Sequence, residues 1–263
     1  MGSGDKNIPR RVAESLKLEL FDNQKLKDKA LKMGIPIEDL KGLDEKAPGF
    51  FDRFLSTKTE AYLDLMKSVV YEVSRDGNGV VIGHGSQILL RDFGCALHVL
   101  IHSSDTARVQ NISKGNGISR ESAEKLIHKS DNERKGFFRF AFNMSWDDPS
   151  LYDLIINPEK IGIEVSIKLI IEAANSEEIK TCSLTALETM EKLSQEKLIR
   201  AALLKSNINL SSLHLEVPTK GVALISGFTE SDGDKQRIIG VVKAVPGISE
   251  VQPEIAVVEV YGE

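Results

Sequence analysis

Short apolar runs alternate with longer segments of helical periodicity over much of this chain. The apolar runs are Val80–Gly83, Leu97–Ile101 and Leu154–Ile156, and the helical patterns around them include Ile8–Leu18, Thr57–Ser74, Thr106–Phe142 and Glu159–Ala174. Strands that are apolar at every position are typical of parallel sheets, which helices cover on both faces. The alternation therefore predicts an α/β domain over residues 1–174, with a parallel sheet and helices on both faces.

A different pattern follows a polar stretch at Asn175–Glu178. We interpret residues 175–194 as a linker that continues in part as a helix, and residues 195–263 as a small α+β module. Its predicted elements are a helix over Lys197–Leu204, strands over Leu213–Val217 and Val222–Ser226, a helix over Asp234–Val245 and a strand over Ile255–Val260. Two domains also agree with the length of 263 residues, because one core rarely grows much beyond about 250 residues.

Composition and charge exclude several classes of protein. No apolar run approaches the roughly 18 residues that a membrane span needs, and no apolar signal segment is visible, so we expect a cytoplasmic protein without a transmembrane segment. A net charge of -5, without a basic tract, argues against nucleic acid as a partner. Cys95 and Cys182 lie far apart and belong to no CxxC pair, so the sequence predicts inert, buried thiols rather than a disulfide or a metal site.

The first residues carry part of a phosphate-binding turn. Gly2-Ser3-Gly4 precedes a helical pattern, and backbone N–H groups in such a turn point at phosphates. Asp5 stands where a lysine is usual, Lys6 comes one place late, and Asn7 replaces a hydroxyl ligand of magnesium. The strand expected before the turn is missing from the chain, and a glycine-rich terminus capped by Asp5 or Asn7 is the alternative interpretation.

Several ordered segments resemble the cytidylate kinase-like family over roughly residues 1–174. They are GSGDKNIPRRVAESL, LDEKAP, VVIGHGSQILL, LHVLIHSSDTARV, ISRESAEKLIHKSDNERKGFFRF and SWDDPSLYDLIIN. The resemblance implies a P-loop kinase that moves the terminal phosphoryl group of ATP onto a pyrimidine nucleoside monophosphate, CMP or dCMP, with Mg²⁺ between the phosphates. It assigns ATP binding to Gly2, Ser3, Gly4 and Lys6.

The same resemblance places the acceptor nucleotide at the lid helix. Asp131-Asn132-Glu133-Arg134 reproduces the Asp-x-x-Arg spacing of cytidylate kinases, in which Arg binds phosphate and Asp accepts from an exocyclic amine. A three-residue step places Asp131 and Arg134 on one helical face, which also suits an ordinary surface salt bridge. Arg108 resembles the lid arginine that faces the transferring phosphate, and a solvated charge at a helix start is the alternative.

Two more residues complete the predicted substrate site. His84 follows a buried strand in a glycine-rich turn, where parallel strands form a crevice at their carboxyl ends. The family often has Arg there, and a neutral imidazole binds phosphate less strongly than a guanidinium, so a structural role for His84 stays open. Asp153 is expected to orient a lid arginine. His98 and His102 lack an acidic third ligand, and the sequence predicts no metal-ligating residues in the chain.

The C-terminal module resembles a BON domain through Val222-x-Leu224-x-Ser226-Gly227 and Val245-Pro246-Gly247-Ile248. Such domains are often assigned to phospholipid or small ligands, but acidic residues outnumber the basic ones here, which fits anionic lipid poorly. We therefore expect a regulatory or assembly module with a protein or small-ligand partner. Two functions remain open: a nucleotide-binding kinase that uses Arg108 and Arg134 for catalysis, or an inactive kinase-like sensor or scaffold. The oligomeric state stays open as well.

Overall fold

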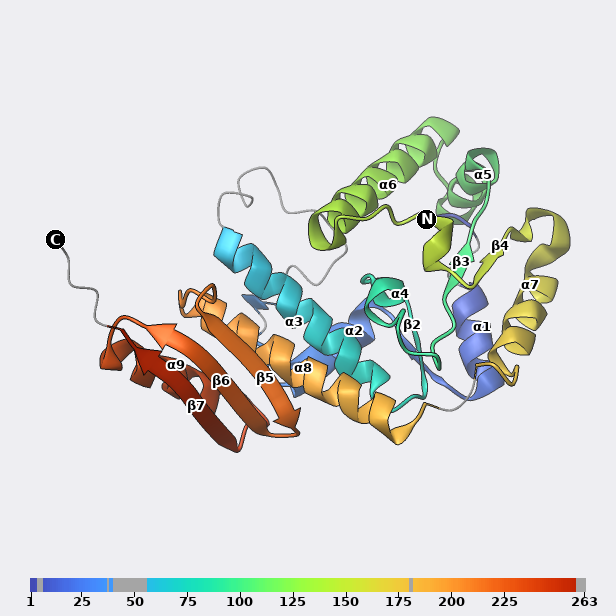
Figure 1. The fold of residues 1–263 in the computed structure, drawn as a ribbon. Helices are drawn as coiled ribbons and strands as arrows, with labels where there is room; N and C mark the ends of the chain where they lie inside the picture. Colours follow the sequence, from blue (N-terminus) through green and yellow to red (C-terminus); the bar gives the residue numbers. More distant parts are fainter. Residues whose placement is uncertain (4–6, 37, 40–55, 180–181, 259–263) are drawn as a thin grey trace. The chain divides into compact units, whose positions relative to one another are not determined.

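The computed structural model describes residues 1–3, 7–36, 38–39, 56–179 and 182–258 as a mixed α/β protein (Figure 1). The chain forms two compact units. The described parts of unit 1 come from residues 1–25 and 77–182, and those of unit 2 from residues 26–76 and 183–258. The predicted boundaries at 174 and 195 stay a prediction; by packing, the described residues between 26 and 76 belong to the unit that contains the C-terminal sheet.

Unit 1 contains two pairs of short parallel strands. β1 pairs with β2, and β3 pairs with β4, which confirms the parallel arrangement predicted from the apolar runs. β1 was not predicted, because three residues between two helices carry no periodic signal. The elements are α1 Asn7–Leu16, β1 Glu19–Phe21, β2 Gly79–Val81, α4 Ser86–Leu89, β3 Val99–Ile101, α5 Asp105–Asn116, α6 Arg120–Phe142, β4 Leu154–Ile156 and α7 Pro158–Ala174.

Helices α1 and α7 share one hydrophobic cluster with the β3–β4 pair. The buried residues of this cluster are Ile8, Val12, Ile156, Ile167 and Ile170. Val99 and Leu154 are register partners that pack against the cluster, so one face of this strand pair is covered by both helices. This packing places the start of α5, which follows β3, beside the start of α7.

The helical region predicted over 106–142 is two helices rather than one. Gly117 ends α5 in the left-handed conformation, with φ 66°, and its N–H donates to the carbonyl of Ser113. Ser119 then caps α6 by accepting from the N–H of Ser122 at 3.1 Å. The periodicity continues across the break, and only these two capping residues reveal it.

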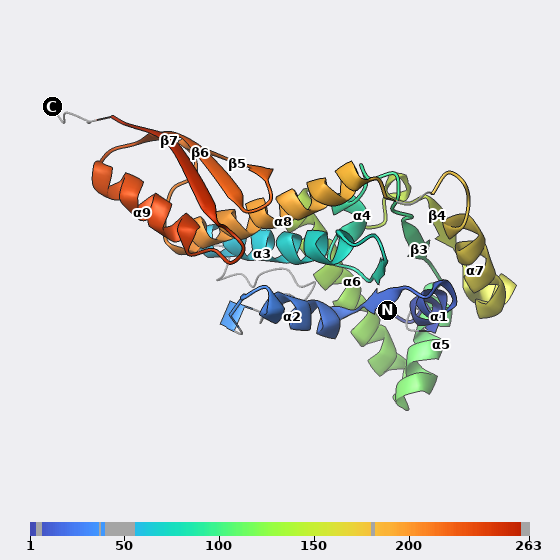
Figure 2. The same ribbon diagram turned by 90° about the horizontal axis from the view of Figure 1, so that it is seen from below.

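Unit 2 consists of helices packed on one face of a three-stranded sheet. α8 and α9 lie on the same side of the sheet, and α3 runs along α8 (Figure 2). β5 is antiparallel to β6 and β7 is parallel to it, in the order β5-β6-β7. The elements are α2 Asn23–Lys32, which starts in unit 1, α3 Ser56–Ser74, α8 Leu184–Lys205, β5 Leu213–Thr219, β6 Val222–Thr229, α9 Asp232–Lys243 and β7 Glu250–Val257.

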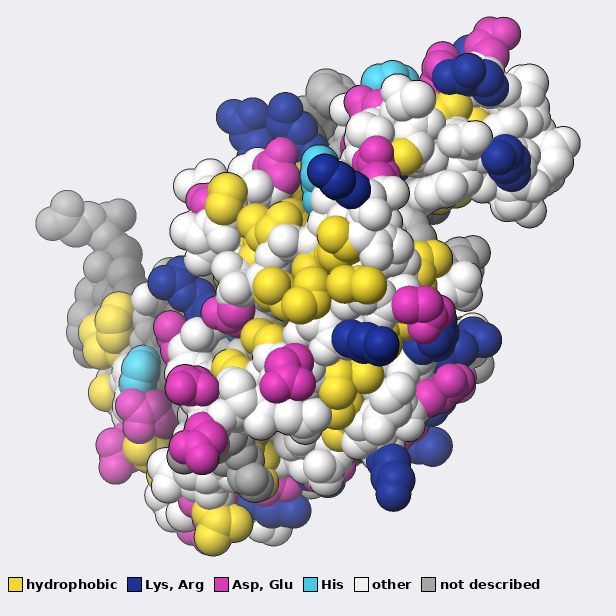
Figure 3. Space-filling view, turned by 90° about the vertical axis from the view of Figure 1, so that its right-hand side faces the viewer, with side chains coloured by type: hydrophobic (Ala, Val, Ile, Leu, Met, Phe, Trp, Pro, Cys, Tyr) yellow, Lys and Arg dark blue, Asp and Glu magenta, His cyan; other side chains and the backbone are white. Residues whose placement is uncertain are grey.

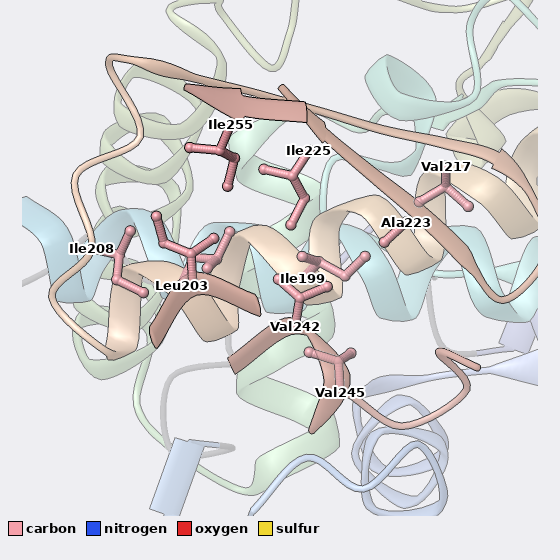
Figure 4. Close-up of a cluster of buried hydrophobic side chains, with 10 residues drawn as sticks. Ile199, Leu203, Ile208, Val217, Ala223, Ile225, Val242, Val245 and Ile255 are labelled. Carbon is pink, nitrogen blue, oxygen red and sulfur yellow. The ribbon is translucent and has the colours of Figure 1, made fainter. Parts of the chain in front are cut away.

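The core of this unit lies between the sheet and its two helices (Figure 4). Ile199 and Leu203 of α8 and Val242 of α9 point toward Ile225 of the central strand. Gly227 on that strand has φ 126°, and a Cβ atom there would lie 2.1 Å from the carbonyl oxygen of Ser212. Glycine at this position lets the chain before β5 approach the sheet.

Helix α8 is longer than the helix predicted over Lys197–Leu204. A single helix covers Leu184–Lys205, so the helical continuation expected within 175–194 and the predicted short helix are one element. Ser183 caps it by accepting from the N–H of Ala186 at 3.1 Å. Its length is set by packing: the Ser194 hydroxyl donates to the carbonyl of Ser68 on α3, and Arg200 contacts Asp64 at 3.2 Å.

The prediction of two separate thiols is wrong. Cys95, between α4 and β3, forms a disulfide with Cys182, where unit 1 ends. Their Cα atoms are 5.0 Å apart although 87 positions separate them in the sequence. Disulfide formation depends on this distance in the folded chain and not on spacing along the sequence, so the pairing could not be predicted from the spacing of the two cysteines.

Helix α7 leaves part of its apolar surface exposed. Ile161, Val165 and Leu169 are 40–45% exposed, and hydrophobic side chains gather where α7 lies in the space-filling view (Figure 3). Charged residues of both signs, among them Lys168 and Glu172, are interspersed with them. No helix among the described residues is both long and apolar enough to cross a bilayer.

Candidate nucleotide site on the lid helices

Arg108 is the centre of a polar cluster between α5 and α6. Its Nη1 and Nη2 donate to the two carboxylate oxygens of Asp131 at 2.8 and 2.7 Å. Nη1 also donates to Asp105 at 3.2 Å, and Nε donates to the carbonyl of Met1 at 2.8 Å. The side chain is only 10% exposed, and these four hydrogen bonds use Nε and both Nη atoms inside the protein.

The pairing shifts the titration of both partners. Hydrogen bonding to Asp131 raises the pKa of Arg108 above its ordinary value, although burial opposes this. Burial raises the pKa of Asp131, but the hydrogen bonds and charge of Arg108 outweigh burial, and the pKa of Asp131 lies below its ordinary value. At neutral pH the pair is a bidentate, charge-assisted interaction.

The start of α5 is held from two sides, which fixes Arg108 one turn along it. Ser104 caps the helix by accepting from the N–H of Ala107 at 3.3 Å. The Ser104 hydroxyl donates to Glu159, in the first turn of α7, at 3.1 Å, and the Ser104 N–H donates to the same carboxylate. The cap and the carboxylate together satisfy helix-start donors that would otherwise meet solvent.

The described part of the N-terminal glycine turn lies against α5. The carbonyl of Gly2 accepts from Asn111 Nδ2 at 2.8 Å, and Ser3 is buried. Gly2 has φ 86°, and a Cβ atom there would lie 2.9 Å from the carbonyl oxygen of Arg108, so only glycine fits this approach. Gly4 and Lys6, also predicted to bind ATP, lie outside the described residues.

Arg134 lies one helical turn after Asp131 and stacks on the single tryptophan. Its guanidinium carbon is 5.0 Å from the centre of the Trp146 ring. Tyr152 donates its hydroxyl to the carbonyl of Trp146 at 2.5 Å, and Gln87 donates to that hydroxyl at 3.1 Å. The positive charge of Arg134 also contributes to the lowered pKa of Asp131. Asp131 thus lies in the field of two guanidinium groups.

The other two predicted substrate residues have structural contacts of their own. His84 is 1% exposed, has φ 57°, and its Nε2 lies 2.8 Å from Asn23 Oδ1. Asp153 accepts from the backbone N–H of His98 at 2.7 Å and extends the β3–β4 pairing. Hydrogen bonds thus join Arg108 to Asp131, and Arg134 follows one turn later on the same helix, whereas the contacts given for His84 and Asp153 are with Asn23 and His98.

Sequence reasoning missed some residues that shape this region. Asn111 holds the glycine turn, and it could have been found because it lies three residues after Arg108 on the same helical face. A pocket of about 200 Å³ between α5 and α6 was also missed, and Arg120 and His128 are among its lining residues. It is smaller than the roughly 300–1,000 Å³ of most ligand pockets, and it shares Asp105 with the Arg108 cluster.

Both parts of the chain are similar to known proteins. Residues 194–259 match the model of the BON domain. The cytidylate kinase of Methanocaldococcus jannaschii is 23% identical over 179 residues, which is 66% of this chain and 93% of that protein. The cytidylate kinase of Archaeoglobus fulgidus is 24% identical over 181 residues, covering 68% and 93%.

A solved structure shares the fold. The crystal structure of an uncharacterized protein from Eubacterium ventriosum superposes with a TM-score of 0.52, at 18% identity, over 67% of this chain and 94% of that one. The model of the cytidylate kinase-like family matches residues 1–160, which is more than half of the chain. The chain therefore belongs to the cytidylate kinase-like family.

Proposed function

We propose that this chain binds a pyrimidine nucleoside monophosphate, CMP or dCMP, at the Arg108–Asp131–Arg134 cluster and phosphorylates it with ATP and Mg²⁺. The observation that supports this most is the bidentate pairing of Arg108 with Asp131 on α6, with Arg134 one helical turn further along the same helix. A phosphate group presents oxygens to arginine in the same forked geometry as a carboxylate. Without nucleotide, Asp131 occupies the place that a phosphate would take.

Nucleotide binding would exchange partners within this cluster. The incoming phosphate would take the fork of Arg108 and contact Arg134, and Asp131 would then be available to accept from the exocyclic amine of cytosine. In the reaction the acceptor phosphate oxygen attacks the γ-phosphorus of ATP and ADP leaves. Most of the rate would come from positioning and from charge stabilisation by the arginines and Mg²⁺.

ATP and Mg²⁺ would bind at the glycine turn, where Gly2 and Ser3 lie beside α5 and α1 begins at Asn7. Magnesium usually reaches such sites on the phosphates of ATP, with few protein ligands. Because Gly4 and Lys6 are outside the described residues, the proposal depends on the residues proposed to bind CMP and not on those proposed to bind ATP.

The second candidate is a nucleotide sensor without catalysis. It is favoured by the hydrogen bonds of Arg108 to protein groups, which a phosphate would have to displace, and by Asp5, which follows Gly2-Ser3-Gly4 in the sequence. In this case CMP would bind and Mg²⁺-ATP would not be turned over. The BON domain would then transmit the nucleotide state to a partner.

Calorimetric titration with CMP and separately with Mg²⁺-ATP, followed by a coupled ADP-release assay, separates the two candidates. Binding of both nucleotides with CMP-dependent ADP release supports the kinase. CMP binding without turnover supports the sensor, and absence of CMP binding would overturn both.

A matched pair of variants places the site. Arg134→Ala should weaken CMP binding by at least about 1.5 kcal/mol, or roughly tenfold, because it removes a charge-assisted phosphate contact. Arg139→Ala removes an exposed arginine from the same helix and should leave the CMP affinity unchanged. Equal affinities in both variants would exclude Arg134 from the site.

We also propose that the protein is cytoplasmic, as expected from the sequence. The Cys95–Cys182 bond argues against this location, because disulfides are uncommon in cytosolic proteins of mesophiles and are often transient there. Trapping thiols with an alkylating reagent in intact cells would show both thiols alkylated in a reducing compartment and neither in an oxidising one.

A further inference from the structure

The outward face of the β5–β6–β7 sheet has an apolar centre. Residues alternate between the two faces of a strand, and Ala223 and Ile225 of β6 point into the core (Figure 4). Val222, Leu224 and Phe228 alternate with them and face outward, and Phe228 is 56% exposed. Both α8 and α9 pack on the inward face. Within the described residues of unit 2, no helix covers the outward one.

Such a face is unusual for a sheet of this kind. A sheet with antiparallel pairing that is covered on one side normally presents polar side chains to water on the other. Here the outward side of the middle strand carries Val222, Leu224 and Phe228 beside a single polar residue, Ser226. Exposed apolar patches with a polar rim commonly mark interaction sites. The apolar centre therefore indicates a surface that another molecule covers.

The rim of the face is acidic. Glu216 on β5 and Glu250 and Glu254 on β7 flank the apolar row, and all three are exposed. His214 lies beside Glu216, with its Nε2 2.8 Å from the carboxylate. The three strands contain no Lys or Arg. The rim thus attracts cationic groups and repels anionic ones.

We propose that this face docks a basic amphipathic segment of a partner protein. Apolar side chains of the segment would cover Leu224 and Phe228, and its Lys or Arg residues would meet Glu216, Glu250 and Glu254. An anionic bilayer fits poorly because its charge has the same sign as the rim. The surface lies in unit 2 and does not depend on nucleotide binding in unit 1.

The test uses the full chain and a fluorescein-labelled synthetic peptide of about 18 residues, with Leu on one helical face and Lys on the other. We expect an anisotropy change that saturates, and weaker binding when salt rises from about 50 to about 300 mM, because screening reduces the attraction between exposed charges. A peptide with Glu in place of Lys should not bind.

Variants locate the binding on this face. Phe228→Ser should weaken peptide binding at least tenfold, and the double variant Glu216→Gln, Glu254→Gln should weaken it several-fold and reduce its salt dependence. Leu184→Ser and Glu188→Gln remove an exposed leucine and an exposed glutamate from α8, outside this face, and should bind like the original chain. All these side chains are exposed, and hydrogen exchange of the β6 amides checks that the sheet is intact.

The proposal is overturned if the peptide does not bind, or if Phe228→Ser binds as tightly as Leu184→Ser. It is also overturned if vesicles of phosphatidylcholine, with or without phosphatidylglycerol, bind in a Phe228-dependent way in place of the peptide. Self-association that Phe228→Ser abolishes, measured by analytical ultracentrifugation, would assign the face to a second copy of the chain instead.

Discussion

The two units achieve stability by different means. In unit 2 the central strand places Ala223 and Ile225 in a core where both are fully buried. In unit 1 the strands are three residues long, and β2 and β3 are half-buried at every position. Unit 1 adds polar and covalent links instead: the Arg108–Asp131 pair, the Ser104–Glu159 contact and a disulfide. Unit 1 thus adds specific pairs to smaller apolar clusters, whereas the sheet of unit 2 has one larger apolar core.

The largest expected effect tests the apolar side of this comparison. Ile225→Ala should lower the free energy of unfolding of unit 2 by about 4 kcal/mol, since it leaves a cavity in a fully packed core. Hydrogen exchange of peptides from β6 and α8 measures it, and fluorescence of Trp146, the single tryptophan, reports on unit 1. Leu184→Ala, at a 79% exposed position, should change little. An equal loss of stability in unit 1, followed by Trp146 fluorescence, would show that the two units unfold together.

The disulfide tests the covalent side. Cys95→Ser should destabilise unit 1 by about 2–4 kcal/mol, because a crosslink across 87 positions restricts the unfolded chain. Denaturant melts followed by Trp146 fluorescence measure the change. Cys182→Ser should cost as much as Cys95→Ser, and the double variant no more than either. An unchanged midpoint of the denaturant melt would mean that the polar pairs stabilise unit 1 without the disulfide.

The Arg108–Asp131 pair tests the polar side. Arg108→Met, Asp131→Asn and their combination form a double-mutant cycle, and we expect a coupling energy of about 1.5 kcal/mol for the bidentate contact. Trp146 fluorescence in urea measures each variant. Because the pKa of Asp131 is lowered in the folded state, this coupling should be present at neutral pH and be lost as pH falls below the ordinary aspartate range. Additive single effects would contradict an energetic role for the pair.

The smallest effect concerns pH. Burial lowers the pKa of His98, so folding favours its neutral form. The stability of unit 1 should be highest above the unfolded pKa of about 6.5 and fall as pH drops from there through the lowered pKa. His98→Gln should flatten this slope between about pH 7 and 5, whereas His102→Gln, at an exposed position, should preserve it. An identical slope in both variants would assign the dependence to other groups.

Helices and strands with strong periodicity could be predicted, whereas tertiary pairings could not. The apolar run at Leu154–Ile156 became β4 as expected. β7 was placed too late because Pro253 lies within it, and proline is tolerated there since β7 is an edge strand. The break between α5 and α6 did leave a signal in Gly117 and Ser119. The sequence therefore contains enough information to predict two helices over 106–142.

For the candidate site, the sequence could not predict the contacts between side chains. The family resemblance assigned Arg108, Asp131 and Arg134 to the site, and that assignment stays a prediction. The hydrogen bonds between Arg108 and Asp131 could not be foreseen, because they depend on how α5 packs against α6. The Cys95–Cys182 bond has the same origin, a contact between segments distant along the chain.

The pairing of α3 with α8 has a consequence for biosynthesis. α3 emerges from the ribosome well before α8 is made, and until then Met66, Val69 and Val70 lack the helix that covers them. At about 5–20 residues per second this interval is on the order of ten seconds, long enough for a chaperone to bind. A nascent chain stalled near residue 174 would therefore present an uncovered α3, and the C-terminal unit would fold only after synthesis of the sheet.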